Sequence, residues 1–271
     1  MISILIRNKN EEKSLEKTIK AINAQRMSEP YEIILVDDNS SDNSVEIANK
    51  YGRGNVKVIQ LDKKFTYGYA INFGVRHCKY EIILLLSSHN LLISNDFFEK
   101  LPTYFVNPKV AGVRCTPIAN SKQIEQSFDG FITLDKTNYS HPNDWQNLLV
   151  ANCSAIRKNV ALEYLFNEEI RSNEEKLWCL DVMKADYSII SNVPCYFLYI
   201  KKNSLSAEIR DTISKYQVDG IKIKTVPAFL FILLKSIPWA IKIAAITWYN
   251  NIKGHLMTTL IPFKYHKGVY K

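Results

Sequence analysis

Short, continuous apolar runs recur along the chain, and each is followed by a polar cluster or a segment with helical periodicity. Continuous rather than alternating apolar runs are typical of parallel strands that are buried on both faces. Strands that alternate with helices at this spacing predict an α/β fold with a mostly parallel sheet flanked by helices. The expected strands are Ile2–Ile6, Tyr31–Val36, Val56–Gln60, Glu81–Leu86, Val110–Cys115 and Val150–Arg157.

The segments between these runs carry the helical pattern. Ser41 and Asp42 have the residue types that cap a helix, which places a helix start just after them. Residues 116–150 are rich in turn-forming residues, and no element is assigned there. The expected helices are Glu11–Gln25, Ser44–Lys50, Gly68–Cys78, Asn95–Val106 and Glu174–Lys184.

Polar clusters follow three of the expected strands, with the sequences RNKN, DDNSSD and SSHN. In open α/β sheets, ligands bind at the carboxyl ends of the strands, so we expect the three clusters to form one site. Asp37 and Asp38 could accept hydrogen bonds from a nucleobase or a ribose, or could cap the next helix. Ser87, Ser88 and His89 could contact a diphosphate or its counter-ion, or could form a strand-end turn.

Glycine-rich phosphate loops are excluded by the sequence. No GxGxxG follows the first strand and no GxxxxGK[ST] occurs, so neither a Rossmann dinucleotide site nor a P-loop is predicted. With only nine glycines in the chain, we expect basic side chains or a cation to hold any diphosphate.

Cysteine usage and the start of the chain indicate the compartment. The five cysteines are scattered, odd in number and without a CxxC pair, which argues against a disulfide framework or a zinc knuckle and fits a reducing cytosol. The chain begins MISILIRNKNEE and lacks the basic head and apolar stretch of a signal peptide. We therefore expect a cytoplasmic protein.

The net charge of +8 is concentrated at the carboxyl-terminal end. Residues 221–271 contain eight lysines and no Asp, Glu or Arg, which leaves the rest of the chain neutral. The stretch 226–252 is apolar but interrupted by Lys235 and Lys242, which form one stripe of an amphipathic helical pattern with Lys253. No run is long enough to cross a membrane. The pattern predicts a helical extension that binds an anionic membrane surface. The alternative is a helical hairpin packed on the rest of the protein. Nucleic acid is not expected as a partner, because arginines and an exposed polar platform are missing.

Five segments, taken in order, resemble the family 2 glycosyltransferases, which have the GT-A fold. They cover about residues 1–200, and none of them is specific by itself. The resemblance implies a catalytic domain at 1–220, with a donor half at about 1–115 and an acceptor half at about 116–220, followed by the tail at 221–271. The segments are ISILIRNKNEE, EIILVDDNSSDNS, FTYGYAINFG at Phe65–Gly74, YEIILLLSSHN and NEEKLW.

The resemblance implies roles for the donor half. Asp38 corresponds to the acid that reads the nucleobase, with Asp37 beside it, and Arg7 and Lys9 lie where the family contacts the nucleoside. The segment Phe65–Gly74 corresponds to one under the donor diphosphate. Asn72 within it and Lys64 just before it could contact the donor, although Asn72 could equally serve helix packing.

A departure from the family occurs at its metal-binding D-x-D motif. That motif falls on Ser87, Ser88 and His89, so that His89 replaces the metal-ligating aspartate. The LS-x-H pattern is similar to that of a rhamnosyltransferase-like branch. His89 could ligate a divalent metal such as Mn²⁺ or Mg²⁺, or could donate a hydrogen bond to the diphosphate. We expect a weakened metal requirement.

The segment NEEKLW is similar to the family's E-D-x-x-W segment, whose second acid is the general base of an inverting transfer. Glu175 takes that position, with Glu174 beside it, and Trp178 lines the acceptor side or belongs to the core. Taken alone, the two acids would favour the dipole at the start of a helix. The family's histidine pair is absent, because Tyr199-Ile200-Lys201 stands at that position.

The function expected from the resemblance is inverting transfer of a hexosyl or deoxyhexosyl group. The donor would be a nucleotide-diphosphate sugar, and the acceptor a glycan or lipid-linked glycan of surface polysaccharide biosynthesis. The enzyme would be peripheral at the inner face of the cell membrane. The alternative is a catalytically silent relative that acts as a nucleotide-binding or scaffold subunit.

Overall fold

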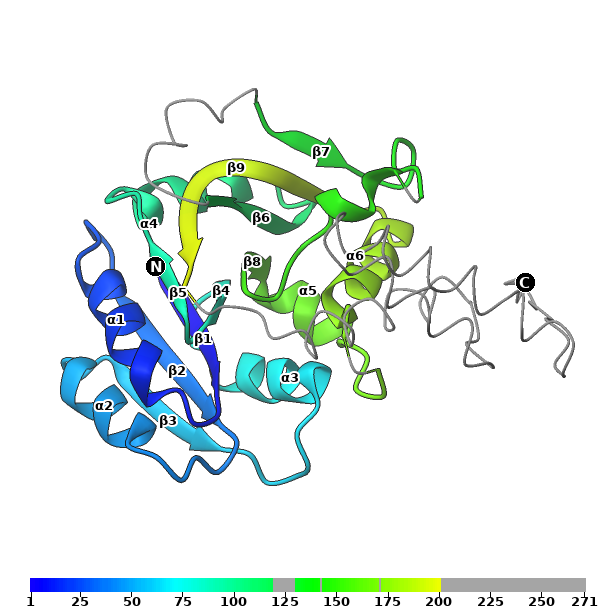
Figure 1. Ribbon diagram of the computed structural model, residues 1–271. Helices are drawn as coiled ribbons and strands as arrows, with labels where there is room; N and C mark the ends of the chain where they lie inside the picture. Colours follow the sequence, from blue (N-terminus) through cyan, green and yellow to red (C-terminus); the bar gives the residue numbers. More distant parts are fainter. Residues whose placement is uncertain (119–129, 142, 171, 201–271) are drawn as a thin grey trace, which may run out of the picture. The chain divides into compact units, whose positions relative to one another are not determined.

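A nine-stranded mixed sheet runs through the protein, in the strand order β3-β2-β1-β4-β8-β6-β9-β5, with β7 paired to β9 (Figure 1). The computed structural model describes residues 1–118, 130–141, 143–170 and 172–200 of the chain. These residues belong to one compact unit, Met1–Lys201. The predicted boundary at residue 220 and the predicted amphipathic tail lie outside the described residues.

The first half of the sheet is parallel, as the continuous apolar runs predict. β1 pairs with β2 and β4, and β2 pairs with β3, all in parallel. The carboxyl ends of these strands therefore meet at one edge of the sheet. The elements are β1 (Ile2–Asn8), α1 (Glu12–Asn23), β2 (Tyr31–Asp37), α2 (Ser44–Tyr51), β3 (Val56–Gln60), α3 (Tyr67–His77), β4 (Ile82–Ser87) and β5 (Asn90–Leu92).

The second half of the sheet is mixed, with β8 antiparallel to both β4 and β6, and β9 parallel to β6. Because β8 runs against β4, the turn before β8 lies at the edge where β4 ends. The elements are α4 (Phe97–Lys100), the 3₁₀ helix η1 (Leu101–Phe105), β6 (Val110–Ile118), β7 (Ile132–Leu134), the 3₁₀ helix η3 (Asn143–Asn147), β8 (Cys153–Arg157), α5 (Lys158–Glu163), α6 (Glu174–Lys184) and β9 (Ser188–Tyr199).

Three sequence-based expectations need correction. The expected helix Asn95–Val106 is a short α4 followed by η1, with Pro102 at the start of the 3₁₀ turn. The expected strand Val150–Arg157 begins only at Cys153, because the preceding residues form a turn. The cap of α2 is Asn43 rather than the Ser41/Asp42 pair, although the Asp42 carboxylate accepts a hydrogen bond from the Ser44 N–H.

The apolar core lies on both faces of the sheet. Ile4 and Ile6 of β1 belong to the cluster that α1 and α4 cover, whereas Leu5 points to the opposite face and meets α3 at Gly74. Gly68 at the start of α3 is required for packing, since a Cβ there would lie 2.1 Å from the Asn167 carbonyl oxygen. This close approach joins the donor half to the segment that precedes α6.

Candidate functional site

Asp37 closes β2 at the edge where the parallel strands end, and its carboxylate is fully buried. Its Oδ1 accepts hydrogen bonds from Asn8 Nδ2 at 2.8 Å and from the Ser40 hydroxyl, and its Oδ2 accepts one from the Ser40 N–H at 2.9 Å. A buried carboxylate with this many donors is satisfied within the protein. Asp37 therefore holds the turn that presents Asp38.

Asp38 lies on the outer side of the same turn. Its Oδ2 accepts a hydrogen bond from Lys9 Nζ at 2.6 Å, and the side chains of Lys9 and Asp38 are 58% and 14% exposed. The Asp38 N–H donates to the Asn8 carbonyl at 2.9 Å, which ties the turn to β1. The carboxylate thus keeps acceptor capacity for a ligand and stands beside an exposed cation.

Ser87 and His89 lie where β4 ends. His89 Nε2 is 2.8 Å from Ser87 Oγ, and Nδ1 is 3.7 Å from Glu11 Oε1. The ring makes an edge contact with Tyr199, with the centroids 4.8 Å apart. Sequence reasoning did not assign Glu11 or Tyr199 to the site, although both lie within segments that it named. Ser88 is buried and accepts a hydrogen bond from Thr18 through its carbonyl, so it supports the turn.

The metal that the family resemblance implies was tested against the residues present around His89. The donor set consists of one imidazole and one carboxylate, and both ring nitrogens face a protein partner. No group of three His, Cys, Asp or Glu side chains that could hold a metal ion occurs in the described part of the chain. These residues do not fit a divalent cation unless the imidazole gives up its contact with Ser87.

Arg7 connects β1 to the start of α6. Its Nη1 lies 3.3 Å from Glu174 Oε1, its Nη2 donates to the Ala151 carbonyl at 3.0 Å, and its guanidinium lies over the Tyr67 ring at 5.2 Å. Tyr67 was not predicted as a site residue, although it falls in the FTYGYAINFG segment. A cation in contact with three separate segments fixes the donor half against the acceptor half.

Glu174 and Glu175 begin α6 and are both buried, with 3% and 8% of their surface exposed. Asn173, just before them, has a left-handed backbone with φ of 66°, a conformation that costs energy for a non-glycine residue. Two carboxylates are thus placed side by side in a low-dielectric position. Such an arrangement is typical of catalytic acids and bases.

Burial is the main cause of the perturbed acidity of this pair. Desolvation raises the pKa of Glu174, although the charge of Arg7 opposes the rise. Desolvation, and then the negative charge of Glu174, raise the pKa of Glu175 to about 8. Glu175 is therefore a carboxyl group that binds and releases a proton near neutral pH.

Three other residues that the sequence predicted for the site lie outside the groups of side chains described above. Trp178 is buried, donates from Nε1 to the Tyr164 carbonyl and stacks on Phe166, as expected for its core alternative. Asn72 is buried and exchanges hydrogen bonds with the Phe166 backbone and the Glu168 carboxylate, which matches the packing alternative. Lys64 is exposed, in the loop before α3.

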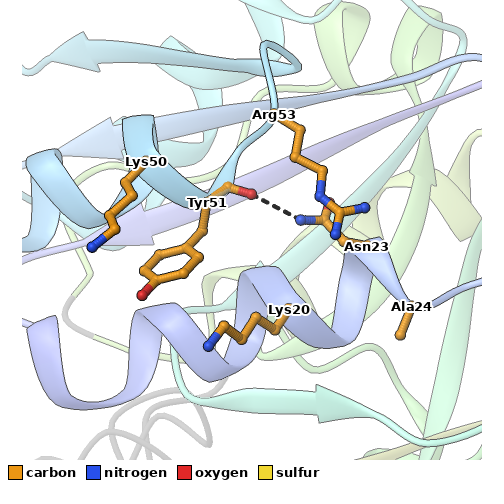
Figure 2. A pocket seen from close by; sticks show the side chains of 6 residues that line it. All are labelled: Lys20, Asn23, Ala24, Lys50, Tyr51 and Arg53. Atoms are coloured by element: carbon orange, nitrogen blue, oxygen red, sulfur yellow. Dashed lines mark hydrogen bonds between the residues drawn. The ribbon is translucent and has the colours of Figure 1, made fainter.

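A pocket between α1 and α2 is separate from this site. Two lysines of the pocket lie near its one aromatic ring: Lys20 Nζ and Lys50 Nζ are 4.7 and 5.4 Å from the Tyr51 ring centroid. Asn23 accepts a hydrogen bond from the hydroxyl of Tyr31, the first residue of β2, so the pocket lies toward the amino ends of the strands. Figure 2 shows its lining by Lys20, Asn23, Ala24, Lys50, Tyr51 and Arg53.

Comparison with known sequences assigns a family to this geometry. The family described as Glycosyl transferase family 2 matches residues 3–165, more than half of the chain. The poly-beta-1,6-N-acetyl-D-glucosamine synthase of Staphylococcus epidermidis is 26% identical over 122 residues, which are 45% of this chain and 29% of that protein. The chain thus matches less than a third of the length of this relative.

A second relative is matched over most of its length. It is the dolichyl N-acetyl-alpha-D-glucosaminyl phosphate 3-beta-D-2,3-diacetamido-2,3-dideoxy-beta-D-glucuronosyltransferase of Methanococcus voltae. The two sequences are 23% identical over 238 residues, which cover 82% of this chain and 74% of that protein.

Solved structures establish the fold. The mannosyltransferase PcManGT of Pyrobaculum calidifontis, solved with GDP-Man and Mn²⁺, superposes with a TM-score of 0.64 at 14% identity, covering 95% of this chain and 78% of that one. TarS of S. aureus, solved with UDP-GlcNAc, gives 0.59 at 17% identity, with coverage of 87% and 71%. The described sheet and its flanking helices therefore have a GT-A-like fold.

Proposed function

Because the chain belongs to glycosyl transferase family 2, we propose that it transfers a hexosyl or deoxyhexosyl group, with inversion, from a nucleotide-diphosphate sugar. The acceptor is a glycan or lipid-linked glycan of surface polysaccharide biosynthesis. The two sequence relatives support this class, since one is named as a synthase of a polysaccharide and the other as a transferase acting on a dolichyl-linked sugar phosphate.

The donor occupies the edge where β1, β2 and β4 end. Asp38 accepts hydrogen bonds from the nucleobase or ribose, and Lys9 stands beside it as a cation. The diphosphate lies between Arg7, Ser87 and His89, where a guanidinium and a hydroxyl–imidazole pair provide N–H and O–H donors. No step of the reaction is assigned to a metal, because the residues around His89 do not fit one.

Glu175 acts as the general base. Its carboxylate removes the proton of the acceptor hydroxyl as the hydroxyl oxygen attacks the anomeric carbon. The bond between that carbon and the diphosphate oxygen breaks with its electron pair, the nucleoside diphosphate leaves, and the proton remains on Glu175. Attack opposite the leaving group inverts the anomeric centre.

The single observation that carries the proposal is the contact between Arg7 and Glu174. It ties the strand that ends in the donor site to the carboxylate pair at the start of α6, at 3.3 Å. A donor and a base must lie side by side for in-line attack, and this ion pair sets their separation. The neighbouring Glu175 is held at the same helix end.

The membrane association is proposed from the sequence of the tail. A peripheral site at the inner face of the cell membrane would bring the enzyme to a lipid-linked acceptor, and the lysines of residues 221–271 would bind anionic lipid. No helix in the described ranges combines the length and the apolar character needed to cross a bilayer.

The test begins with a search for the donor. Thermal unfolding against UDP-, dTDP- and GDP-sugars, with and without Mn²⁺, identifies the nucleotide that stabilises the protein. Single-turnover transfer of the labelled sugar to membrane glycolipids is then compared between wild type, Glu175→Gln and the exposed α6 control Asp181→Asn. We expect Glu175→Gln to bind the donor but to transfer about 10²–10⁴ times more slowly. Undiminished transfer by Glu175→Gln would sink the base assignment, and donor binding without transfer by the wild type would favour the silent alternative.

A further inference from the structure

The strand β6 lies between β8 and β9 in the sheet (Figure 1), and Arg114 is in the middle of β6. Its neighbours Val113 and Cys115 point into the apolar core, and side chains alternate along a strand. Arg114 therefore faces the other side of the sheet, where its partner in register on β8 is Ser154. An arginine at the centre of a sheet requires an explanation.

This face of β6 adjoins the proposed acceptor half. A Cβ on Gly112 would lie 2.7 Å from the Leu149 side chain, and the Leu149 backbone is near enough to the Cys179 thiol on α6 to oppose the rise of its pKa. Two residues after Leu149, the Ala151 carbonyl accepts the hydrogen bond from Arg7. The turn before β8 thus contacts β6, α6 and the arginine of the donor site.

The charge of Arg114 is incompletely compensated. Nη1 donates to Asn192 Oδ1 at 2.7 Å, whereas Nε is buried without a hydrogen-bond partner. Nowhere in the described ranges is a carboxylate paired with this guanidinium, and burial lowers its pKa. A partly buried cation without an anion is costly, so this position is destabilising in the absence of a ligand.

The backbone opposite Arg114 is also strained. Asn192 has a φ of 62°, within β9, where the pairing with β6 shifts register between Val113 and Cys115. Bulges of this kind re-aim side chains next to active sites. Asn192 lies at this bulge, and its amide oxygen accepts the hydrogen bond from Arg114 Nη1, while Nε has no partner in the described part of the chain.

We propose that Arg114, held by Asn192, is the anchor of an anion subsite that takes a phosphate or carboxylate group of the acceptor. The planar guanidinium suits such groups because it donates two parallel hydrogen bonds. The assignment to the acceptor rests on the proposed function, whereas the anion site itself does not. A neutral acceptor would leave Arg114 uncompensated.

The experiment measures thermal unfolding of the full-length chain in chloride and in inorganic phosphate at equal ionic strength. The proteins are wild type, Arg114→Gln, Arg114→Lys and the exposed control Arg76→Gln. We expect Arg114→Gln to have a higher melting temperature than wild type in chloride, because the uncompensated charge is gone. Phosphate should raise the melting temperature of wild type, and most of this increase should be lost in Arg114→Gln. Arg114→Lys should keep part of that gain, and Arg76→Gln all of it. An equal gain in wild type and Arg114→Gln, or no gain in wild type, overturns the anion site.

A second measurement tests whether the anion belongs to an acceptor. Binding of glucose 1-phosphate, glucose and inorganic phosphate is compared by calorimetry in wild type and Arg114→Gln. Binding of the sugar phosphate at least about tenfold tighter than phosphate, and lost in Arg114→Gln, supports the acceptor assignment. Equal affinities overturn that assignment. Repeating the titration in Glu175→Gln separates the two proposals, since the anion response should persist even if that variant transfers sugar normally.

Discussion

The turn after β2 and the start of α6 lie at the same edge of the sheet, but their buried carboxylates have different surroundings. Asp37 is surrounded by donors, from Asn8 and twice from Ser40. Glu174 and Glu175 share a buried position in which Arg7 pairs with Glu174, and their pKa values are raised. The donor half therefore satisfies its buried Asp37 carboxylate within the protein, whereas burial in the acceptor half disfavours the charged forms of Glu174 and Glu175.

The largest effect on stability is expected in the donor half. Asp37→Ala leaves the Asn8 amide and the Ser40 N–H without their buried acceptor, and should lower the free energy of unfolding by about 3 kcal/mol. Urea denaturation measures it. Asp38→Ala is the control, because it removes an ion pair with the exposed Lys9 that is worth less than about 1 kcal/mol, although donor affinity should fall. Equal destabilisation by the two substitutions would contradict the assignment of Asp37 to the fold and Asp38 to the ligand.

A smaller decrease in the free energy of unfolding is expected for a substitution where the donor and acceptor halves meet. Asn72→Ala removes the hydrogen bonds that clamp α3 to the Phe166 backbone and should cost about 2 kcal/mol, while donor affinity stays within about twofold. Lys64→Ala, at an exposed position, should change stability by less than about 0.5 kcal/mol. Calorimetric donor titrations and urea denaturation of both variants separate packing from binding. A large loss of donor affinity in a fully stable Asn72→Ala would assign this residue to the ligand instead.

In the acceptor half, substitution of a buried carboxylate should raise the free energy of unfolding rather than lower it. The pKa of Glu175 is raised in the folded protein from about 4.5 to about 8, so the folded state binds more protons than the unfolded state between these values. Stability from this group is complete below pH 4.5 and is lost as pH rises through about 8. Glu175→Gln should therefore be more stable than wild type above pH 8, and Asp181→Asn should not. A destabilised Glu175→Gln at pH 9 would show that the carboxylate is compensated after all.

The smallest effect is expected on removal of divalent ions. Because both nitrogens of His89 already face Ser87 and Glu11, EDTA should change donor affinity by less than about twofold, whereas His89→Asp should make donor binding dependent on Mn²⁺. Calorimetry with and without EDTA measures both. Donor binding by wild type that is lost in EDTA and restored by Mn²⁺ would overturn this expectation.

The sequence predicted the positions of most elements because their signals are local. The apolar runs located β1, β2, β3 and β4 to within two residues at either end, and α6 spans Glu174–Lys184 as expected. β6 extends to Ile118 rather than ending at Cys115, and β9 was not predicted. The convergence of three polar clusters followed from parallel pairing alone. The same local signals failed at Asn95–Val106, where the proline at 102 favoured a 3₁₀ turn over a continuous helix.

The division of labour within the site could not be predicted, since it depends on contacts between distant segments. Asp37 and Asp38 are neighbours with the same chemistry, and the contacts of Asp37 with Asn8 and Ser40 make it the structural one. Arg114 carries no motif, and its surroundings come from β9, almost eighty residues later. Tyr199 likewise reaches His89 only because β5 pairs with β9. Sequence spacing contains no information about such pairs.

The central claim is that Glu175 is a buried base that ionises near neutral pH. The most direct test is the pH dependence of single-turnover transfer at saturating donor, in wild type and Glu175→Gln. The rate of wild type should rise about tenfold per pH unit below the pKa and level off near pH 8. The rate of Glu175→Gln should be low and independent of pH over the same range. A variant that keeps the wild-type slope would contradict the claim, because another group would then be removing the proton.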